Sequence, residues 1–534
     1  MPKIDGINLG YSYHLPTAGW GLRIRNTLSQ FSDLFSEFNK YIAPAYHHDR
    51  CERSVQMRLY SMHKREFVMV FVAFFACFGL ALFIGLAGPP ITLKQSIDGG
   101  GLLAKDNKTI TNHATGPYTM RSPEMSTYNQ QLWLIAKLNT GNKDDETFDK
   151  SFRVNVNIEG LTSEHKPVEI LQDTKNRTRH LKCVKQSCQE FIVLHLAFLK
   201  YNHYMFTVHF YDLESFHQRY HIKDITFYFV TYNPAFTQIE VWFRLIFLLS
   251  SFVIFVWYTH VMKKYEVCFW SIEQSWINVL LPTLLFYNNP SFPMMLLANS
   301  WLPGVMDAFS QITFLACLLL YWLSTYHGLR QNDRKWARFY VPKLIIVGVL
   351  WFSALTLSIL EKFNEQQDPT YNHTVDASYY YGLKIVFFTF CAIYITYLFL
   401  LMLRAYTELR SMPFFDMRLK FLTLLMCIVL AIILTQTVMG FGVGILEDKF
   451  VTNLDIHYSS SAQFMSFYGL INFYVYTMAY VYSPPGNSAI QDFGITKDNP
   501  AFSMINDSDE DVIYGSDEES RRPLNRPRND DDSD

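Results

Sequence analysis

The sequence has little charge and lacks the short signatures of the common enzyme classes. Only 18% of its 534 residues are charged, and a net charge of −2 gives no sign of a nucleic-acid partner. It contains no nucleophile elbow, no phosphate-binding loop and no HExxH zinc motif. We therefore expect a protein that is not an enzyme, binds no cofactor or metal ion and has no nucleic-acid partner.

Apolar residues, in contrast, make up half of the chain and gather into long runs. The first run, FVMVFVAFFACFGLALFIGLA at 67–87, has 21 residues without a charge. A bilayer core of ~30 Å needs about 20 helical residues, so this run predicts a membrane-spanning helix. Seven further spans are predicted after a large insert, at 241–262, 276–298, 305–328, 341–360, 381–403, 419–442 and 462–482.

Proline interrupts one of these spans. Pro282, Pro290 and Pro293 all fall within 276–298. Because lipid offers no hydrogen bonds, a break there is expected only where protein or a cavity satisfies the freed backbone groups. This interrupted span is the one feature of the sequence that favours a channel or transporter.

Lysine and arginine predict the orientation in the membrane. The short loops fall into two alternating sets, with 10 of these residues in one set and 2 in the other. The richer set comprises 263–275, 329–340 and 404–420, which places it in the cytosol. Both termini are then cytosolic, and the insert 88–238 lies in the lumen or outside the cell. Run 67–87 is too long for a cleaved signal and reads as a signal anchor.

The predicted fold is a multi-pass α-helical membrane protein with an antiparallel β-sandwich outside the membrane. Its tail is too acidic and too poor in apolar residues to fold. The expected parts are a cytosolic segment at 1–66, a first transmembrane helix at 67–87, the lumenal or extracellular sandwich at 88–238, a seven-helix bundle at 239–482 and the disordered cytosolic tail at 483–534.

The sandwich is predicted because the insert changes to a two-residue periodicity. The stretch FRVNVNIEG at 152–160 alternates apolar and polar residues, as do YMFTVHFY at 204–211 and ITFYFV at 225–230. Short alternating strands with turn residues between them are typical of an antiparallel sandwich. Segments 131–138, 168–172, 179–184 and 190–199 bring the number of predicted strands to about seven.

Cys183 and Cys188 are the only cysteines of the insert. In an oxidising lumen this pair predicts a hairpin disulfide, with two reduced thiols as the alternative. A zinc site would need four ligands, and it is not expected here. Three glycosylation sequons lie on the same side of the membrane and are expected to be modified, at Asn107, Asn176 and Asn372. A fourth, at Asn506, lies in the cytosolic tail and is expected to stay unglycosylated.

Three ionisable residues within predicted spans, Arg244, Asp307 and Lys384, lie near the lumenal helix ends. There they can pair or reach the headgroups, and Glu240 is four residues from Arg244. Asp307 is expected in the first turn of its helix, where the helix dipole favours it. The alternative is a functional one. It places a lumen-facing cavity at Asp307, Lys384, Tyr468 and Asn472.

Seven helices after the insert raise the possibility of a rhodopsin-like receptor, but two motifs are missing. The third of these helices ends in STYHGLR, without Asp/Glu-Arg-Tyr. The last reads NFYVYTMAYVYSPP, without Asn-Pro-x-x-Tyr. A rhodopsin-like receptor is therefore not expected.

The tetrapeptide Asn-Pro-Ala-Phe occurs twice, on opposite sides of the predicted membrane. In the lumenal copy, Pro234 is expected to end a strand, and Thr237 with Glu240 to form a capping box that opens the next helix. The cytosolic copy is expected to be a sorting motif for cytosolic adaptors, with a solvated spacer as the alternative. Its residues are Asn499, Pro500 and Phe502, followed by the candidate phosphorylation sites Ser508 and Ser516, whose phosphates would add charge to an acidic cluster.

Several long stretches closely resemble the transmembrane protein 181 family. They include STYNQQLWL, LLPTLLFYNNPSFPMMLLANSWLPG, ELRSMPFFDMRLKFLT and KDNPAFSMINDSDEDVIYGSD. The resemblance runs from about Met57 to the tail. It implies a Wntless-like protein, in which a lumenal GOLD-type β-sandwich caps a seven-helix bundle with a cavity open to lumen or lipid. Relatives act in secretory trafficking, Wntless escorts lipidated cargo, and this family has been linked to the action of a bacterial toxin.

The function favoured at this point is a trafficking or cargo receptor of the Golgi, endosomes and plasma membrane. Its expected partners are the lipid bilayer, a lumenal protein or lipid ligand of unknown identity, and cytosolic sorting adaptors. The alternatives are a cell-surface receptor, which signals or is exploited by a bacterial toxin, and a channel or transporter.

Overall fold

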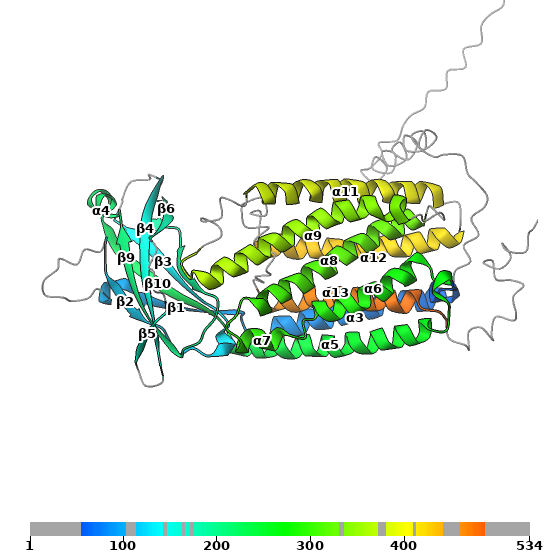
Figure 1. The fold of residues 1–534 in the computed structure, drawn as a ribbon, viewed down its shortest axis with the longest axis horizontal. Coiled ribbons are helices and arrows are strands. Elements are labelled where there is room, and N and C mark those ends of the chain that lie inside the picture. The colour runs from blue at the N-terminus through cyan, green and yellow to red at the C-terminus, as the bar shows by residue number, and fades with distance from the viewer. Residues whose placement is uncertain are drawn as a thin grey trace, which may run out of the picture. The chain divides into compact units, whose positions relative to one another are not determined.

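The computed structural model describes residues 55–102, 114–141, 147–162, 166–170, 176–184, 186–329, 336–371, 381–409, 413–441 and 460–485. These residues form a β domain, residues 92–232, and a bundle of helices (Figure 1). Contacts among residues 54–484 place the β domain and the bundle in one compact unit.

The described residues of the β domain form ten strands in one hydrogen-bonded sheet, and every pair of neighbours is antiparallel. The order is β1-β10-β3-β7-β6-β4-β9-β2, with β5 beside β4 and β8 beside β3. The strands are β1 Thr92–Asp98, β2 Tyr118–Arg121, β3 Leu132–Thr140, β4 Thr147–Leu161, β5 Pro167–Glu169, β6 Arg177–Val184, β7 Ser187–Cys188, β8 Phe191–Leu196, β9 His203–Tyr211 and β10 Ile222–Tyr232. Short helices η1 (Gly99–Gly101), η2 (Thr127–Asn129) and α4 (Glu214–Tyr220) connect them.

The sheet curls so that its two ends face each other across one apolar core. Tyr118 of β2 and Phe227 of β10 come from nearly opposite ends of the strand order, yet their ring centroids are 5.4 Å apart. Phe206 of β9 and Phe229 of β10 are 5.8 Å apart in the same way. The predicted antiparallel sandwich is therefore confirmed. Its apolar residues alternate along the strands because successive side chains point to opposite faces.

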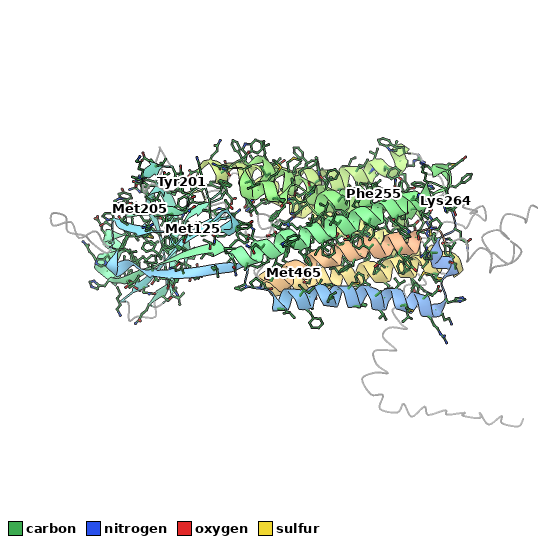
Figure 2. All side chains as sticks on the ribbon, turned by 90° about the horizontal axis from the view of Figure 1, so that it is seen from below. Met125, Tyr201, Met205, Phe255, Lys264 and Met465 are labelled. Carbon is green, nitrogen blue, oxygen red and sulfur yellow. A yellow bond between two sulfur atoms is a disulfide. The ribbon has the colours of Figure 1, made fainter. Side chains whose placement is uncertain are left out.

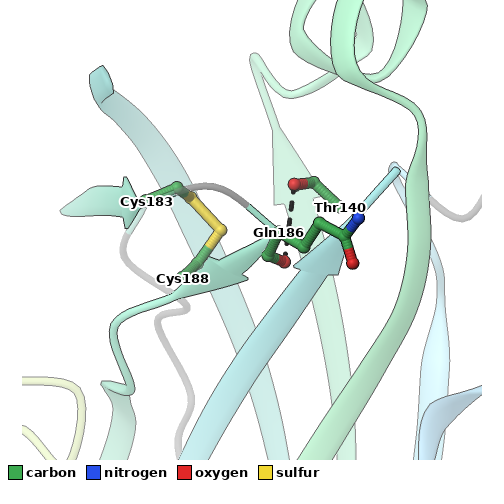
Figure 3. The surroundings of a disulfide bond; sticks show 4 residues. All are labelled: Thr140, Cys183, Gln186 and Cys188. Atoms are coloured by element: carbon green, nitrogen blue, oxygen red, sulfur yellow. Dashed lines mark hydrogen bonds between the residues drawn. A yellow bond between two sulfur atoms is a disulfide. The ribbon is translucent and has the colours of Figure 1, made fainter. Parts of the chain in front are cut away.

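Three strands were not predicted, β1, β2 and β7. Strand β1 reads TLKQSID, and six of its seven side chains are exposed, so it lacks the apolar alternation by which strands are recognised. Strand β7 has only two residues. It is held beside β6 by the predicted disulfide between Cys183 and Cys188, which is confirmed (Figure 3). The turn between these cysteines also contacts β3, where the Thr140 hydroxyl donates to the Gln186 carbonyl at 3.5 Å.

The bundle consists of α3 and the helices that follow the β domain. Among the described residues, six helices are long and apolar enough to cross a membrane: α3 (Lys64–Ala87), α5 (Pro234–Met262), α8 (Leu302–Gly328), α9 (Trp336–Gln367), α11 (Tyr381–Leu409) and α12 (Pro413–Phe441). The others are α2 (Arg58–Ser61), η3 (Val267–Phe269), α6 (Ile272–Tyr287), α7 (Phe292–Leu297) and α13 (Ser461–Tyr482). The chain is thus a multi-pass membrane protein with a β domain.

Helix α13 is buried along most of its length, so its polar side chains face protein and not lipid. It packs closely on α3, because a Cβ atom added to Gly85 would lie 2.5 Å from the Ala462 Cα. Figure 2 shows Met465 of this helix among its neighbours. A helix surrounded by protein can carry groups such as Asn472 when partners satisfy them. Helix α3, in contrast, exposes a wide apolar face with Val72 and Phe83.

The interruption predicted within span 276–298 is present. The span forms α6, which ends at Tyr287, and the short α7, which begins at Phe292. Between them Asn289 has a φ of 49°, a conformation incompatible with a continuing helix. Pro282 lies inside α6 without ending it, and Pro293 lies in the first turn of α7, where proline is tolerated. The break between the two helices therefore lies at the turn formed by Asn288, Asn289 and Pro290.

The two ends of the bundle differ. Helix α5 begins beside the β domain, and Lys264, just after its last residues, lies at the opposite end (Figure 2). Residues before α3 pack into that opposite end, where Met57 and Leu59 are fully buried. The Val55 N–H donates to the Phe269 carbonyl at 2.8 Å, which ties the segment before α3 to η3. A buried ion pair, Arg418 Nε with Glu273 Oε1 at 2.7 Å, lies in the same region.

Candidate functional site: a buried charged cluster where the β domain meets the bundle

Three ionisable side chains meet at the end of the bundle beside the β domain. The Arg244 guanidinium donates to Glu240 Oε1 through Nη2 at 2.9 Å and through Nε at 3.1 Å. Its Nη1 lies 3.7 Å from Asp307 Oδ1 on α8. All three side chains are about nine-tenths buried. Two carboxylates therefore share one guanidinium in a place from which water is largely excluded. We call these residues the charged cluster.

Aromatic rings cover the guanidinium. The centre of the Arg244 guanidinium lies 4.3 Å from the ring centroid of Phe292, 5.5 Å from that of Tyr468 and 5.8 Å from that of Phe464. A cation over ring faces is attracted by the ring quadrupole, and more strongly when desolvated. Helix α7 thus contributes Phe292 as a cover, which gives the short helix after the break a definite role in the site.

The β domain reaches the charged cluster through Gln130, which follows η2. The Nε2 group of Gln130 donates to Glu240 Oε2 at 3.2 Å and is 3.0 Å from the Thr237 hydroxyl oxygen. Gln130 has a φ of 54°, which is uncommon for a residue other than glycine. The neighbouring Asn129 donates to the Tyr232 carbonyl at 3.1 Å. A strained backbone, tied to β10, therefore presents a donor to a buried carboxylate.

A second polar group lies deeper, at the end of α6. Asn288 donates to Asn472 Oδ1 at 2.9 Å and to the Ser251 hydroxyl at 2.7 Å, and Asn472 donates to Asn288 Oδ1 at 3.1 Å. Tyr476 joins through Ser251 at 2.7 Å. At the same place the freed Tyr287 carbonyl accepts from the Tyr468 hydroxyl at 3.3 Å, which is the kind of contact that a helix end within a membrane requires.

Asp307 connects the break to the charged cluster. Asn289 donates to Asp307 Oδ1 at 2.6 Å, and Gln311 donates to Oδ2 at 3.0 Å. The prediction that Asp307 lies in the first turn of its helix is wrong. Helix α8 begins at Leu302, with Pro303 in its first turn, so Asp307 lies in the second turn.

Of the four residues predicted to line a cavity, three belong to this region. Asp307 is in the charged cluster, Tyr468 lies under Arg244, and Asn472 is in the deeper polar group. Lys384 is also buried, but it lies near the start of α11. That helix borders a different feature, an apolar groove of about 350 Å³ lined by Ile345, Gly348 and Phe352 of α9 and by Leu383 and Val386 of α11.

Two buried donors of the site have no hydrogen-bond partner among the described residues. They are Arg244 Nη1 and the Tyr287 hydroxyl. Tyr287 stacks on Tyr468, with ring centroids 5.2 Å apart, so both donors lie in one neighbourhood. An unsatisfied buried donor is costly, which makes this a place for a water molecule or a ligand with an acceptor group. In the described part of the chain, no three His, Cys, Asp or Glu side chains are grouped to hold a metal ion.

The first Asn-Pro-Ala-Phe copy opens α5, but the predicted capping box is wrong. Asn233 is the N-cap, and its side chain accepts from the Ala235 N–H at 3.1 Å. Pro234 occupies the first helical position, so the helix begins before Thr237 and Glu240, which are left free to contact Gln130. Phe236 is buried, with its ring 5.7 Å from that of Phe464.

A second junction joins the β domain to the end of α9. Arg177 of β6 forms an ion pair with Asp368, and Arg179 donates to the Thr370 carbonyl. The His195 N–H of β8 donates to the Pro369 carbonyl at 2.7 Å. Burial disfavours the charged form of Asp368, but hydrogen bonds from Thr370 and Arg177 outweigh it and lower the pKa of Asp368 below its usual value.

Sequence reasoning missed both junctions, because Gln130, Arg177 and His195 follow no periodic pattern. One predicted glycosylation site is described, Asn176, which is exposed and accepts from Asn155 Nδ2 at 2.9 Å. The other predicted sites lie outside the described residues, as does the sequon at Asn506: they are Asn107, Asn372, Asn499, Pro500, Phe502, Ser508 and Ser516.

Comparison with known proteins divides the chain where the structure does. Residues 116–232 match the family model described as "TMEM181, GOLD domain", and residues 233–486 match "Wntless-like, transmembrane domain". Their boundary falls between Tyr232, the last residue of β10, and Asn233, the N-cap of α5. The chain is also similar to Transmembrane protein 181 of Homo sapiens, with 44% identity over 464 residues, which is 87% of this chain and 94% of the relative.

Proposed function

The chain belongs to the transmembrane protein 181 family, as its motifs predict, and we propose that it is a cargo receptor of the secretory pathway. In this proposal a protein or lipid ligand binds to the β domain and the adjoining end of the bundle, and no catalytic step is involved. The observation that carries the proposal is the contact between Gln130 and Glu240, through which the β domain and the charged cluster share a hydrogen bond.

That contact provides a physical route from ligand binding to the helices. A ligand that moves η2 would remove the Gln130 donor from Glu240 Oε2, which is buried. Loss of one partner leaves a buried charged group unsatisfied and costs about 1–3 kcal/mol. The arrangement of α5 and the state of the β domain are then coupled by a free energy of that size, and the coupling is reciprocal.

The proposed orientation places the β domain in the lumen and both chain ends in the cytosol. The lysine and arginine distribution, with 10 residues in one set of loops and 2 in the other, supports it. The exposed Asn176 within a sequon is compatible with a lumenal β domain. Proposed locations are the Golgi, endosomes and plasma membrane, with sorting by cytosolic adaptors that read the tail. A bacterial toxin that binds the exposed β domain is a further proposed partner.

A transporter is the second candidate, because one observation favours it. The break between α6 and α7 lies beside the charged cluster, and transporters place interrupted helices at their binding sites. If the chain is a transporter, liposomes that contain the purified protein are expected to conduct ions or to take up solute. A signalling receptor is a weaker proposal, because an effector entering the opposite end of the bundle would have to displace the buried Met57 and Leu59.

The cargo proposal is tested by proximity labelling from the β domain, followed by comparison of proteins secreted by cells with and without the chain. We expect a subset of labelled lumenal proteins to be depleted from the medium of cells that lack it. The proposal is wrong if the secreted proteins are unchanged and the labelled set matches that of an unrelated membrane protein in the same compartment.

A further inference from the structure

Two buried tyrosine hydroxyls at the end of the bundle away from the β domain have no hydrogen-bond partner among the residues that the structure describes. They belong to Tyr321, near the end of α8, and to Tyr482, the last residue of α13. Both side chains are fully buried. A tyrosine hydroxyl lies at the tip of a rigid ring and cannot turn back to a carbonyl of its own turn, as serine and threonine hydroxyls do. Its partner must therefore come from elsewhere, because an unsatisfied buried hydroxyl is costly.

The two hydroxyls adjoin the buried ion pair of Glu273 and Arg418. Tyr321 and Tyr482 each lie within range of an electrostatic interaction with Glu273, and Tyr321 also lies within range of Tyr482. Arg418 Nε donates to Glu273 Oε1 at 2.7 Å, and Nη2 donates to Oε2. The Glu273 side chain is 0% exposed, so bulk water does not reach it. Each carboxylate oxygen can accept a further hydrogen bond, and Glu273 therefore has acceptor capacity beyond the two bonds from Arg418.

Ser324 and Thr325 add hydroxyls on the same side of α8. They follow Tyr321 by three and four residues, so they share its face of the helix. Both are fully buried, and neither hydroxyl has a hydrogen-bond partner within the described ranges. Thr356, in contrast, donates to the Phe352 carbonyl of its own helix at 2.7 Å. Helices α6, α8, α12 and α13 thus contribute polar groups to one interior region. We call these groups the distal polar cluster: Glu273, Tyr321, Ser324, Thr325, Arg418 and Tyr482.

We propose that the distal polar cluster binds ordered water, which bridges the tyrosine hydroxyls to Glu273. The ion pair has no net charge, so the cluster favours neither a cation nor an anion. Hydroxyls both donate and accept, and a small neutral molecule that does the same fits them. A buried water molecule typically makes about three hydrogen bonds to polar groups that lack other partners. The bound water joins four helices through contacts that can exchange partners. This inference rests neither on the cargo proposal nor on the charged cluster.

Radiolytic hydroxyl-radical labelling of the full chain in lipid nanodiscs tests the proposal, because radicals formed from bound water oxidise the side chains beside it even when these are buried. We expect Tyr321 and Tyr482 to be oxidised severalfold faster than Tyr204. That tyrosine of β9 is equally buried, but its hydroxyl accepts from two backbone N–H groups at 2.7 and 3.0 Å. A radical scavenger in the bulk solvent is expected to slow the labelling of the exposed Tyr128 and to leave Tyr321 and Tyr482 unaffected.

Two labelling results would overturn the proposal. One is oxidation of Tyr321 and Tyr482 that is as slow as that of Tyr204. The other is suppression of their labelling by the scavenger to the same extent as at Tyr128, because bulk solvent and not bound water would then reach them.

Thermal unfolding of two conservative variants gives an independent test. Tyr321→Phe and Tyr482→Phe keep the ring and remove only the hydroxyl. Loss of a hydroxyl that is bonded to water lowers the unfolding midpoint, whereas loss of a hydroxyl without any partner raises it. We expect a lower midpoint for both variants and no shift for Tyr480→Phe, which removes an exposed hydroxyl from the same end of α13. A midpoint that is unchanged or raised in either buried variant would contradict the bound water.

Discussion

Gln130 Nε2 lies 3.2 Å from Glu240 Oε2, and this contact joins the two segments that the family models match separately. The other carboxylate oxygen of Glu240 accepts from Arg244 at 2.9 Å. A buried carboxylate of the bundle therefore takes donors from both parts of the chain. A displacement of η2 relative to α5 would therefore alter the hydrogen bonding of Glu240.

Gln130→Ala is expected to lower the free energy of unfolding by about 1–3 kcal/mol, because Glu240 Oε2 stays buried and loses a donor. The measurement is thermal or denaturant unfolding in lipid nanodiscs. Gln95→Ala, on the exposed strand β1, is the matched control and is expected to have little effect. Equal effects of the two variants would show that the Gln130 contact contributes nothing specific.

Cys183→Ser is expected to destabilise the β domain by about 2 kcal/mol, the loop-closure contribution of a disulfide between residues five apart. In cells the variant is expected to be retained in the endoplasmic reticulum. Cys77→Ser removes a free, exposed cysteine of α3 and serves as the control. Normal export and unchanged stability of Cys183→Ser would contradict this account of the hairpin.

The proposed orientation predicts where glycans are added. Asn176→Gln is expected to remove one glycan, because this side chain is exposed and its Oδ1, not the Nδ2 that carries the sugar, accepts from Asn155. Asn107 and Asn372 are expected to behave in the same way in a gel-shift assay with glycosidase, and Asn506→Gln is expected to change nothing. A glycan found on Asn506 would reverse the proposed orientation.

The two Asn-Pro-Ala-Phe copies are expected to respond differently to mutation. Phe236 is 2% exposed and packs near Phe464, so Phe236→Ala is expected to cost about 3–5 kcal/mol and to impair export. Phe502→Ala, or alanine at both Ser508 and Ser516, is expected to shift the protein between Golgi, endosome and surface with folding unchanged. Localisation like that of wild type in the tail variants would leave the second copy without a sorting role.

Local patterns in the sequence were enough to predict the fold class. The apolar runs gave the helices, and alternation such as Phe227 and Phe229 in β10 gave the sheet, because each reflects burial of one face. Strand β1 was missed because exposed edge residues carry no such pattern. The helix start at Leu302 was missed because a search for apolar runs does not register helical residues such as Pro303 and Gly304.

The candidate site could be predicted only in part. Asp307, Tyr468 and Asn472 stood out as polar or ionisable groups within apolar helices, and all three lie in or next to the site. Gln130 and His195 could not be found in the same way. Their roles come from partners that are 110 residues away for Gln130 and in α9 for His195, and such contacts leave no local signal.

The most direct test of the cargo-receptor proposal is a rescue experiment on secretion. Cells lacking the chain receive wild type, Gln130→Ala or Gln95→Ala, and the labelled lumenal proteins are quantified in the medium. We predict that wild type and Gln95→Ala restore secretion, whereas Gln130→Ala, present at the same level in the same compartment, does not. Secretion that is unaffected by loss of the chain, or that Gln130→Ala restores in full, would contradict the proposal that the β domain and the bundle act together on cargo.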